Sequence, residues 1–226
     1  RYFAGPIRPL PEGEQEAHVA VQDDGTVGYS HQRLEIRLRP VTDAELNRAF
    51  ASQSRAGVRS TNPYTFGNWT PLGESWTPAR FTVFWLRISN YEYPKVQLDP
   101  TQATILTTNR RQYRSLRLDE LSEYYRAYAL GLAGNAWARF REQTDILRRT
   151  LYAGAPLFSG QEAEGYIAFP PLDDDVVQLT VTLPDIALRF NYADEPTETI
   201  DLEYVFARDV VRGMHPPADA RLSSAK

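Results

Sequence analysis

The feature that most constrains this fold is a succession of short segments in which apolar and polar side chains alternate. Leu34, Ile36 and Leu38 alternate with charged side chains, and residues 199–206 repeat the pattern. A period of two residues is typical of a strand that buries one face and exposes the other. Residues 81–89 are apolar on both faces at their centre, which predicts a central strand. We therefore expect the chain to be mainly β.

Further strand patterns recur along the chain, separated by turn residues. We expect these strands at 103–107, 113–118, 166–169, 176–183 and 186–192. Seven or more strands joined by loops favour two antiparallel sheets packed as a sandwich. The core that the two sheets share is predicted to contain Phe84, Leu86, Ile88, Leu179, Val181 and Phe206.

Two segments depart from the strand pattern. Thr42 and Glu45 have the spacing of a capping box, which predicts a short helix after them. Within residues 119–151, Asp119 can cap a first helix and Asn135 a second, and apolar side chains recur at helical spacing. We expect this segment to be a helical hairpin, inserted between strands, that packs its aromatic side against the sandwich.

The two ends of the chain have the composition of extended segments. Residues 1–16 contain three prolines and two glycines, so we expect an extended arm with few contacts to the domain. Residues 213–226 combine glycine and proline with small polar residues, which predicts a flexible tail. A single domain is expected over residues 17–212, with the helical insertion inside it.

Composition excludes several classes of protein. Of the 226 residues, 42% are hydrophobic and 24% charged, and no apolar run approaches the ~20 residues that cross a bilayer. The absence of cysteine excludes disulfides and thiolate metal sites. The net charge of −4 argues against nucleic-acid binding. The start at Arg1 is what signal-peptide removal or trimming would leave, and we expect an exported protein.

The sequence contains no recognisable arrangement of catalytic or metal-binding residues. The three histidines, at positions 18, 31 and 215, lack the spacing of a metal site, which needs three or four converging ligands. Nucleophile-elbow, P-loop and dinucleotide-binding motifs are missing. The sequence therefore predicts a protein that is not an enzyme and uses no metal or cofactor.

Two acidic groups have simpler explanations than chemistry. Residues 173–175 are three aspartates that could bind Ca²⁺, but no calcium-binding loop surrounds them, and a solvated turn is expected. Asp119, Glu120 and Glu123 could supply the carboxylate pair of a glycoside hydrolase. Acidic residues at a helix start also complement the helix dipole, which accounts for them without catalysis.

Residues 62–76 form a long connection rich in aromatic residues, and this is the most informative loop of the sequence. Loops of this length inside a compact domain are often functional. Their aromatic side chains either pack over the edge of the sandwich or are presented to a partner, and both roles remain open. We predict a partner-binding surface formed by Tyr64, Phe66, Trp69 and Trp76. Residues 91–94 form a second aromatic loop.

Three motifs carry a resemblance to a known family over about half of the chain. One strand ends in Asn90, Leu98-Asp99 follows in a short strand, and a later strand begins after Gly160-x-x-x-x-Gly165. In these features the chain resembles the immunoglobulin-like (telokin-like) domains of bacterial exported proteins and lipoproteins. The resemblance implies an immunoglobulin-like antiparallel sandwich and an envelope location, and it implies no catalytic residue.

These features together predict a non-catalytic interaction protein of the bacterial cell envelope, in the periplasm or on the outer surface. Residues 105–150 carry nine arginines against five acids, and residues 151–211 two arginines against twelve acids. Such polarity either orients a protein partner or is neutralised internally. An extrinsic subunit of a membrane complex, associated through the N-terminal arm, is one form of this role. The alternative is a sandwich that binds a glycan or small ligand, and a hydrolase is less favoured.

Overall fold

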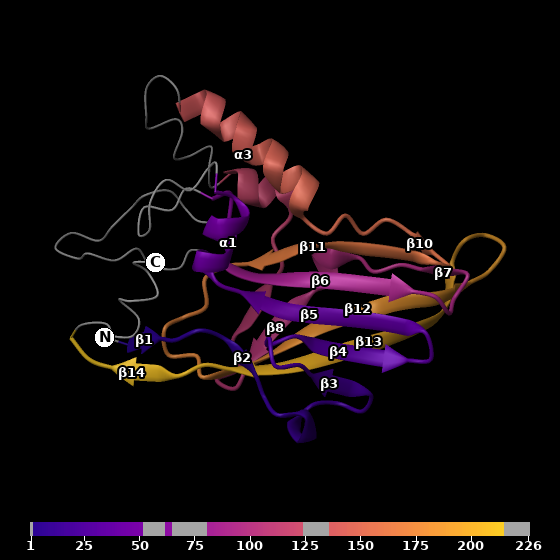
Figure 1. Ribbon diagram of the computed structural model, residues 1–226, viewed down its shortest axis with the longest axis horizontal. Helices are drawn as coiled ribbons and strands as arrows, with labels where there is room; N and C mark the ends of the chain where they lie inside the picture. The colour runs from indigo at the N-terminus through magenta and orange to yellow at the C-terminus, as the bar shows by residue number, and fades with distance from the viewer. Residues whose placement is uncertain (1, 52–61, 65–80, 124–135, 215–226) are drawn as a thin grey trace.

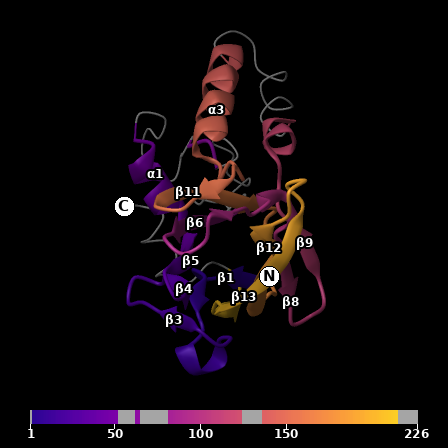
Figure 2. The same ribbon diagram turned by 90° about the vertical axis from the view of Figure 1, so that its right-hand side faces the viewer.

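Two five-stranded antiparallel sheets form the body of the molecule in a computed structural model that describes residues 2–51, 62–64, 81–123 and 136–214. Figure 1 shows the sheets along their strands, and Figure 2 shows them as two layers. The first sheet has the order β11-β6-β5-β4-β3 and the second the order β2-β13-β12-β8-β9. The chain is therefore mainly β, as predicted.

The first sheet is a meander of four consecutive strands, extended by β11 on its other edge. In β5, Leu34, Ile36 and Leu38 are buried, and the charged residues between them lie on the outer face, as the alternation predicted. The strands are β3 (Val19–Val21), β4 (Val27–His31), β5 (Leu34–Val41), β6 (Thr82–Asn90) and β11 (Gln161–Phe169).

The second sheet is built on one long hairpin. The two strands predicted at 176–183 and 186–192 are a single strand, β12, with a register shift between Leu183 and Ile186. Asp185 takes up the irregularity with a φ of 53°, so the chain bends without leaving the sheet. The strands are β2 (Arg8–Pro9), β8 (Thr104–Thr107), β9 (Gln112–Arg114), β12 (Gln178–Phe190) and β13 (Pro196–Ala207).

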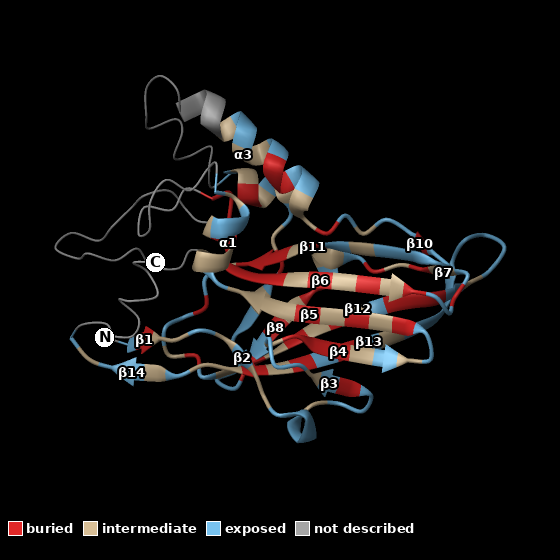
Figure 3. Ribbon diagram, viewed as in Figure 1, coloured by how far each residue is buried: buried red, intermediate tan, exposed pale blue. Residues whose placement is uncertain are grey.

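One apolar core fills the space between the sheets. All six residues predicted for it are buried and belong to one cluster. Figure 3 shows buried residues along the strands of both sheets. Phe84 and Phe206 contact each other across the sheets, with ring centroids 5.2 Å apart. The Tyr204 hydroxyl donates a 2.6 Å hydrogen bond to the carbonyl of Ile36, and burial raises the pKa of this hydroxyl. The sheets are thus joined by packing and by a satisfied polar contact.

A second, smaller core lies on the outer face of the first sheet, under the helices. Val83 and Ala168 of the sheet pack there with Leu46 of α1 (Asp43–Ala49) and Leu147 of α3 (Ala136–Thr150). The predicted capping box at the start of α1 is present, with reciprocal Thr42 and Glu45 hydrogen bonds. This cluster anchors both helices on the sandwich.

The predicted helical hairpin is described only in part. Residues 118–123 are helical, and Leu121 packs in the second core together with α3. The connection at 124–135 and the Trp137 side chain lie outside the described residues. The hairpin geometry therefore stays a prediction.

The expectation that the N-terminal arm makes few contacts with the domain is wrong. Strand β1 (Tyr2–Ala4) pairs with β14 (Val210–Arg212), and β2 pairs with β13. The Gln15 side chain donates to the Val205 carbonyl at 2.8 Å and accepts from the Val205 amide at 2.9 Å. Pro9 is tolerated because β2 is an edge strand, where the missing amide hydrogen is not needed. Residues 215–226 of the predicted tail lie outside the described residues.

Candidate functional site

Tyr64 is the only residue of the predicted partner-binding set that lies within the described parts of the chain. Its side chain is fully buried in the second core, and its hydroxyl lies 2.7 Å from Thr150 Oγ1. Burial raises the pKa of this hydroxyl. The sequence left open whether these aromatic side chains pack on the sandwich or are presented to a partner, and Tyr64 packs on the sandwich. Phe66, Trp69 and Trp76 lie outside the described residues, so their role stays a prediction.

The second aromatic loop lies at the other end of β6 from Tyr64. Tyr64 packs with Phe81 and Val83, where β6 begins, whereas Tyr91 follows Asn90, where β6 ends. Nine residues of strand span roughly 30 Å, so Tyr64 and Tyr91 do not belong to one surface.

Asn90 fixes the path of this second loop. Its Nδ2 donates to the carbonyls of Tyr93 at 2.8 Å and Leu157 at 3.0 Å. Its Oδ1 accepts from the amides of Tyr93 at 2.9 Å and Glu92 at 3.3 Å. The residue is fully buried, so these bonds form where water does not compete. Asn90 therefore ties the loop after β6 to the segment that enters β10 (Leu157–Phe158).

Four connections meet at this end of the sandwich, and we call them the loop end: residues 31–34, 90–95, 157–162 and 190–195. The amide of Tyr91 donates to the Arg33 carbonyl at 3.0 Å, and Lys95 forms an ion pair with Asp194. β10 pairs with β7 (Lys95–Val96), which continues the connection from the 90–95 segment. The label β7 marks this end in Figure 1. The loop end is therefore a connected frame of main-chain and side-chain contacts.

The loop end presents three exposed aromatic side chains. Their exposed fractions are 40% for Tyr91, 53% for Phe158 and 111% for Tyr192. The predicted partner-binding set does not contain Phe158 or Tyr192. Both are aromatic residues beside turn residues, Ser-Gly in one case and Asn in the other, and that juxtaposition was the available signal.

An open hollow of about 390 Å³ lies beside Tyr91, on the outer face of the first sheet. Arginine and glutamate pair within it, Arg37 with Glu35 and Arg87 with Glu162. The hydrogen bond from Arg87 lowers the pKa of Glu162. The hollow can form hydrogen bonds with a polar ligand. Its lining residues are Gln32, Arg33, Glu35, Arg37, Arg87, Ser89, Tyr91 and Glu162.

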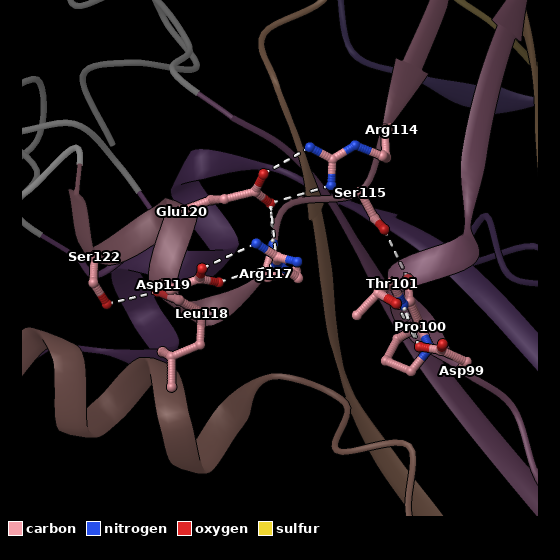
Figure 4. A network of polar contacts seen from close by, with 10 residues as sticks. All are labelled: Asp99, Pro100, Thr101, Arg114, Ser115, Arg117, Leu118, Asp119, Glu120 and Ser122. Carbon is pink, nitrogen blue, oxygen red and sulfur yellow. Dashed lines mark hydrogen bonds and ion pairs between the residues drawn. The ribbon is translucent and has the colours of Figure 1, made fainter.

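Two of the three acidic residues that could serve glycoside hydrolysis, Asp119 and Glu120, are held by arginines (Figure 4). Glu120 accepts from Arg114 at 2.6 Å and from the Arg117 amide at 2.9 Å, and Arg117 also pairs with Asp119. The Arg114 contact lowers the pKa of Glu120, and the Arg117 contact lowers that of Asp119. A general acid needs a raised pKa, so this arrangement does not suit acid catalysis.

The aspartate run at 173–175 is engaged with the β8–β9 hairpin. Arg111 pairs with both Asp173 and Asp175, and the Tyr113 hydroxyl donates to Asp173 at 2.6 Å. These contacts neutralise part of the basic segment 105–150 with part of the acidic segment 151–211. Internal neutralisation was one of the two expectations for this charge polarity. Across the described residues, no three His, Asp or Glu side chains converge on a position for a metal ion.

Comparisons with known proteins give no family. No protein-family model matches the chain, and neither does any curated protein. Among solved structures, the secreted protein MPT63 from Mycobacterium tuberculosis is similar at a TM-score of 0.33 and 10% identity. That likeness covers 73% of this chain and 90% of MPT63, and its low score carries no argument about fold or function. In the described parts of the chain, no helix has both the length and the apolar composition to cross a membrane.

Proposed function

We propose that this chain is a non-catalytic interaction protein that binds a protein partner through the loop end. The observation that carries the proposal is the presence of Tyr91, Phe158 and Tyr192, all exposed, on this cross-linked frame. Aromatic side chains dominate the energetics of protein interfaces because they bury a large area at low entropic cost. A frame fixed before binding further reduces the ordering cost of association.

The electrostatics of the described surface support a non-catalytic role. Glu120, Glu162 and Asp175 each pair with an arginine that lowers the carboxyl pKa. Acid and base catalysts instead have pKa values moved towards the working pH by burial or by like charges. The described carboxylates with shifted pKa values thus stabilise the surface and are poorly matched to proton transfer at neutral pH.

The envelope location extends the proposal. Strands β1 and β14 lie at the end of the sandwich opposite the loop end (Figure 1). An extrinsic subunit held at a membrane through its N-terminal segment would therefore present the loop end away from that membrane.

The immunoglobulin-like (telokin-like) relationship is part of the same proposal. Two antiparallel sheets with one common core support it, and it must accommodate the β3–β6 meander.

A glycan or small polar ligand is the second candidate, and the hollow beside Tyr91 favours it. The Tyr91 ring is an aromatic platform, with the Arg33 guanidinium 5.9 Å from its centroid. Gln32 and Ser89 add neutral hydrogen-bonding groups to the same lining. Pockets for polar ligands combine such platforms with a few directional polar groups.

Capture of the partner from a native membrane fraction tests the proposal. The variants are Tyr91→Ser, Phe158→Ser and Tyr192→Ser, and the control is Leu106→Ser, whose side chain is 52% exposed on the second sheet. A truncated anchor costs about 2 kcal/mol, or roughly thirty-fold in affinity, whereas the control should bind as the wild type does. Equal capture by all four variants would contradict the proposal. Competition by soluble oligosaccharides, lost in the Tyr91 variant, would favour the glycan candidate instead.

A further inference from the structure

Two histidines that are distant in sequence lie side by side at the β3–β4 hairpin. His18 directly precedes β3, and His31 is the last residue of β4. The Ser30 amide donates to the His18 carbonyl at 3.0 Å, which holds the two backbones together. The two imidazole rings have their centroids 5.8 Å apart, at an interplanar angle of 74°.

The backbone at His18 directs its ring towards His31. Val19 pairs with Tyr29, so an extended residue at position 18 would share the face of Ser30. His18 instead has a φ of 66°, and its ring lies 6.4 Å from Tyr29 and 5.8 Å from His31, which occupy the other face. A left-handed conformation costs a non-glycine residue about 1–2 kcal/mol. Residues held in such conformations cluster at functional sites.

The ring separation matches that of two imidazoles on one metal ion. Metal–nitrogen bonds are about 2.0–2.1 Å, which places the centroids of two coordinating rings roughly 4.5 Å apart when the two bonds meet at a right angle and roughly 6.5 Å apart when they are opposite. We propose that His18 and His31 form a binding site for a divalent transition-metal ion, with water in the remaining positions. For imidazole ligands the preference is Cu²⁺ over Ni²⁺ and Zn²⁺.

The surroundings make this an open, exchangeable site rather than a structural one. His18 is exposed and His31 half-buried, so an ion can enter from solvent. In the described part of the chain, no third carboxylate or imidazole converges with them. Two protein ligands with water give weaker binding than the three or four of structural zinc sites. His31 begins the 31–34 segment of the loop end, but the metal site uses none of the three aromatic side chains on which the proposed function rests.

Titration of the intact chain with CuCl₂ tests the site, with calorimetry for affinity and electron paramagnetic resonance for nitrogen coordination. His18→Asn removes the imidazole but tolerates the left-handed backbone, and His31→Gln removes the second ring. His215→Gln is the matched control, because it removes the remaining histidine of the chain. Circular dichroism confirms that each variant is folded.

The expected result is one equivalent of Cu²⁺ with a two-nitrogen signature in the wild type. Binding should be at least ten-fold weaker in His18→Asn and in His31→Gln, and unchanged in His215→Gln. Ni²⁺ and Zn²⁺ should follow the same pattern at lower affinity. Wild-type affinity in His18→Asn, or loss of binding in His215→Gln alone, would overturn the assignment.

Discussion

Replacing Asn90 by alanine removes four hydrogen bonds from a position that water does not reach. A hydrogen bond contributes a net 0.5–1.5 kcal/mol or so to stability, and a buried partner left unsatisfied costs about 1–3 kcal/mol. The carbonyls of Tyr93 and Leu157 are two such partners. We expect Asn90→Ala to lower the free energy of unfolding by about 3–4 kcal/mol. For a chain of this length, that lowers the Tm by roughly 10 °C.

Asn191→Ala is the matched control, because the same side chain makes comparable bonds in the exposed tip of the β12–β13 hairpin. Asn191 Oδ1 accepts from the amides of Ala193 and Glu195, both at 2.9 Å. Water can replace these bonds, so the loss should stay below about 1 kcal/mol. Urea unfolding of both variants gives the two losses in the free energy of unfolding. The slope of that free energy against urea concentration should be the same in both variants and in the wild type. Equal losses in the two variants would refute the argument that burial makes Asn90 the organiser of its loop.

Three further predictions concern packing and charge. A Cβ added at Gly165 would lie 2.5 Å from the Tyr152 amide nitrogen, so Gly165→Ala should lower the free energy of unfolding by about 1–3 kcal/mol, measured by thermal melting. Gly13→Ala is the control and should be neutral, because a Cβ at Gly13 would meet nothing within 4 Å. Tyr64→Phe should cost about 1 kcal/mol by urea unfolding, without changing partner capture per folded molecule. The hydrogen bond from Arg111 lowers the pKa of Asp175, so their pair stabilises the fold above about pH 4 and loses this effect as the carboxyl protonates below it. The melting temperatures of Arg111→Gln and wild type should therefore converge as the pH falls from 7 to 3.

The parts of the fold that sequence predicts are those whose signals are local. The alternation in β5 and the apolar centre of β6 identify buried faces directly, and the Thr42–Glu45 box identifies a helix start. The sequence does not predict β4 because Gly28 and Ser30 lower its strand propensity, and its pairing with β3 and β5 makes it a strand. The arm was misjudged because tertiary pairing at a sheet edge overrides the composition that suggested a tether.

The candidate site was harder to predict because exposure depends on the whole fold. Tyr64 and Tyr192 both lie in turns of the structure, yet one is fully buried and the other fully exposed. The proximity of His18 and His31 depends on the hairpin register and on one positive φ, neither of which their spacing indicates. Asn90 is recognisable in the sequence as the residue that ends a strand, but its hydrogen bond to Leu157 emerges only when β10 is placed beside the loop.

Site-specific photo-crosslinking in the native cell tests the central claim most directly. A photoreactive phenylalanine analogue is placed at Phe158 or Tyr192 of the loop end, and at Leu106 on the second sheet, all of which are exposed side chains. The account predicts one discrete, reproducible protein adduct from both loop-end positions and none from Leu106. An adduct from Leu106 alone, or no protein adduct from either loop-end position, would contradict the loop end as the surface that binds the partner.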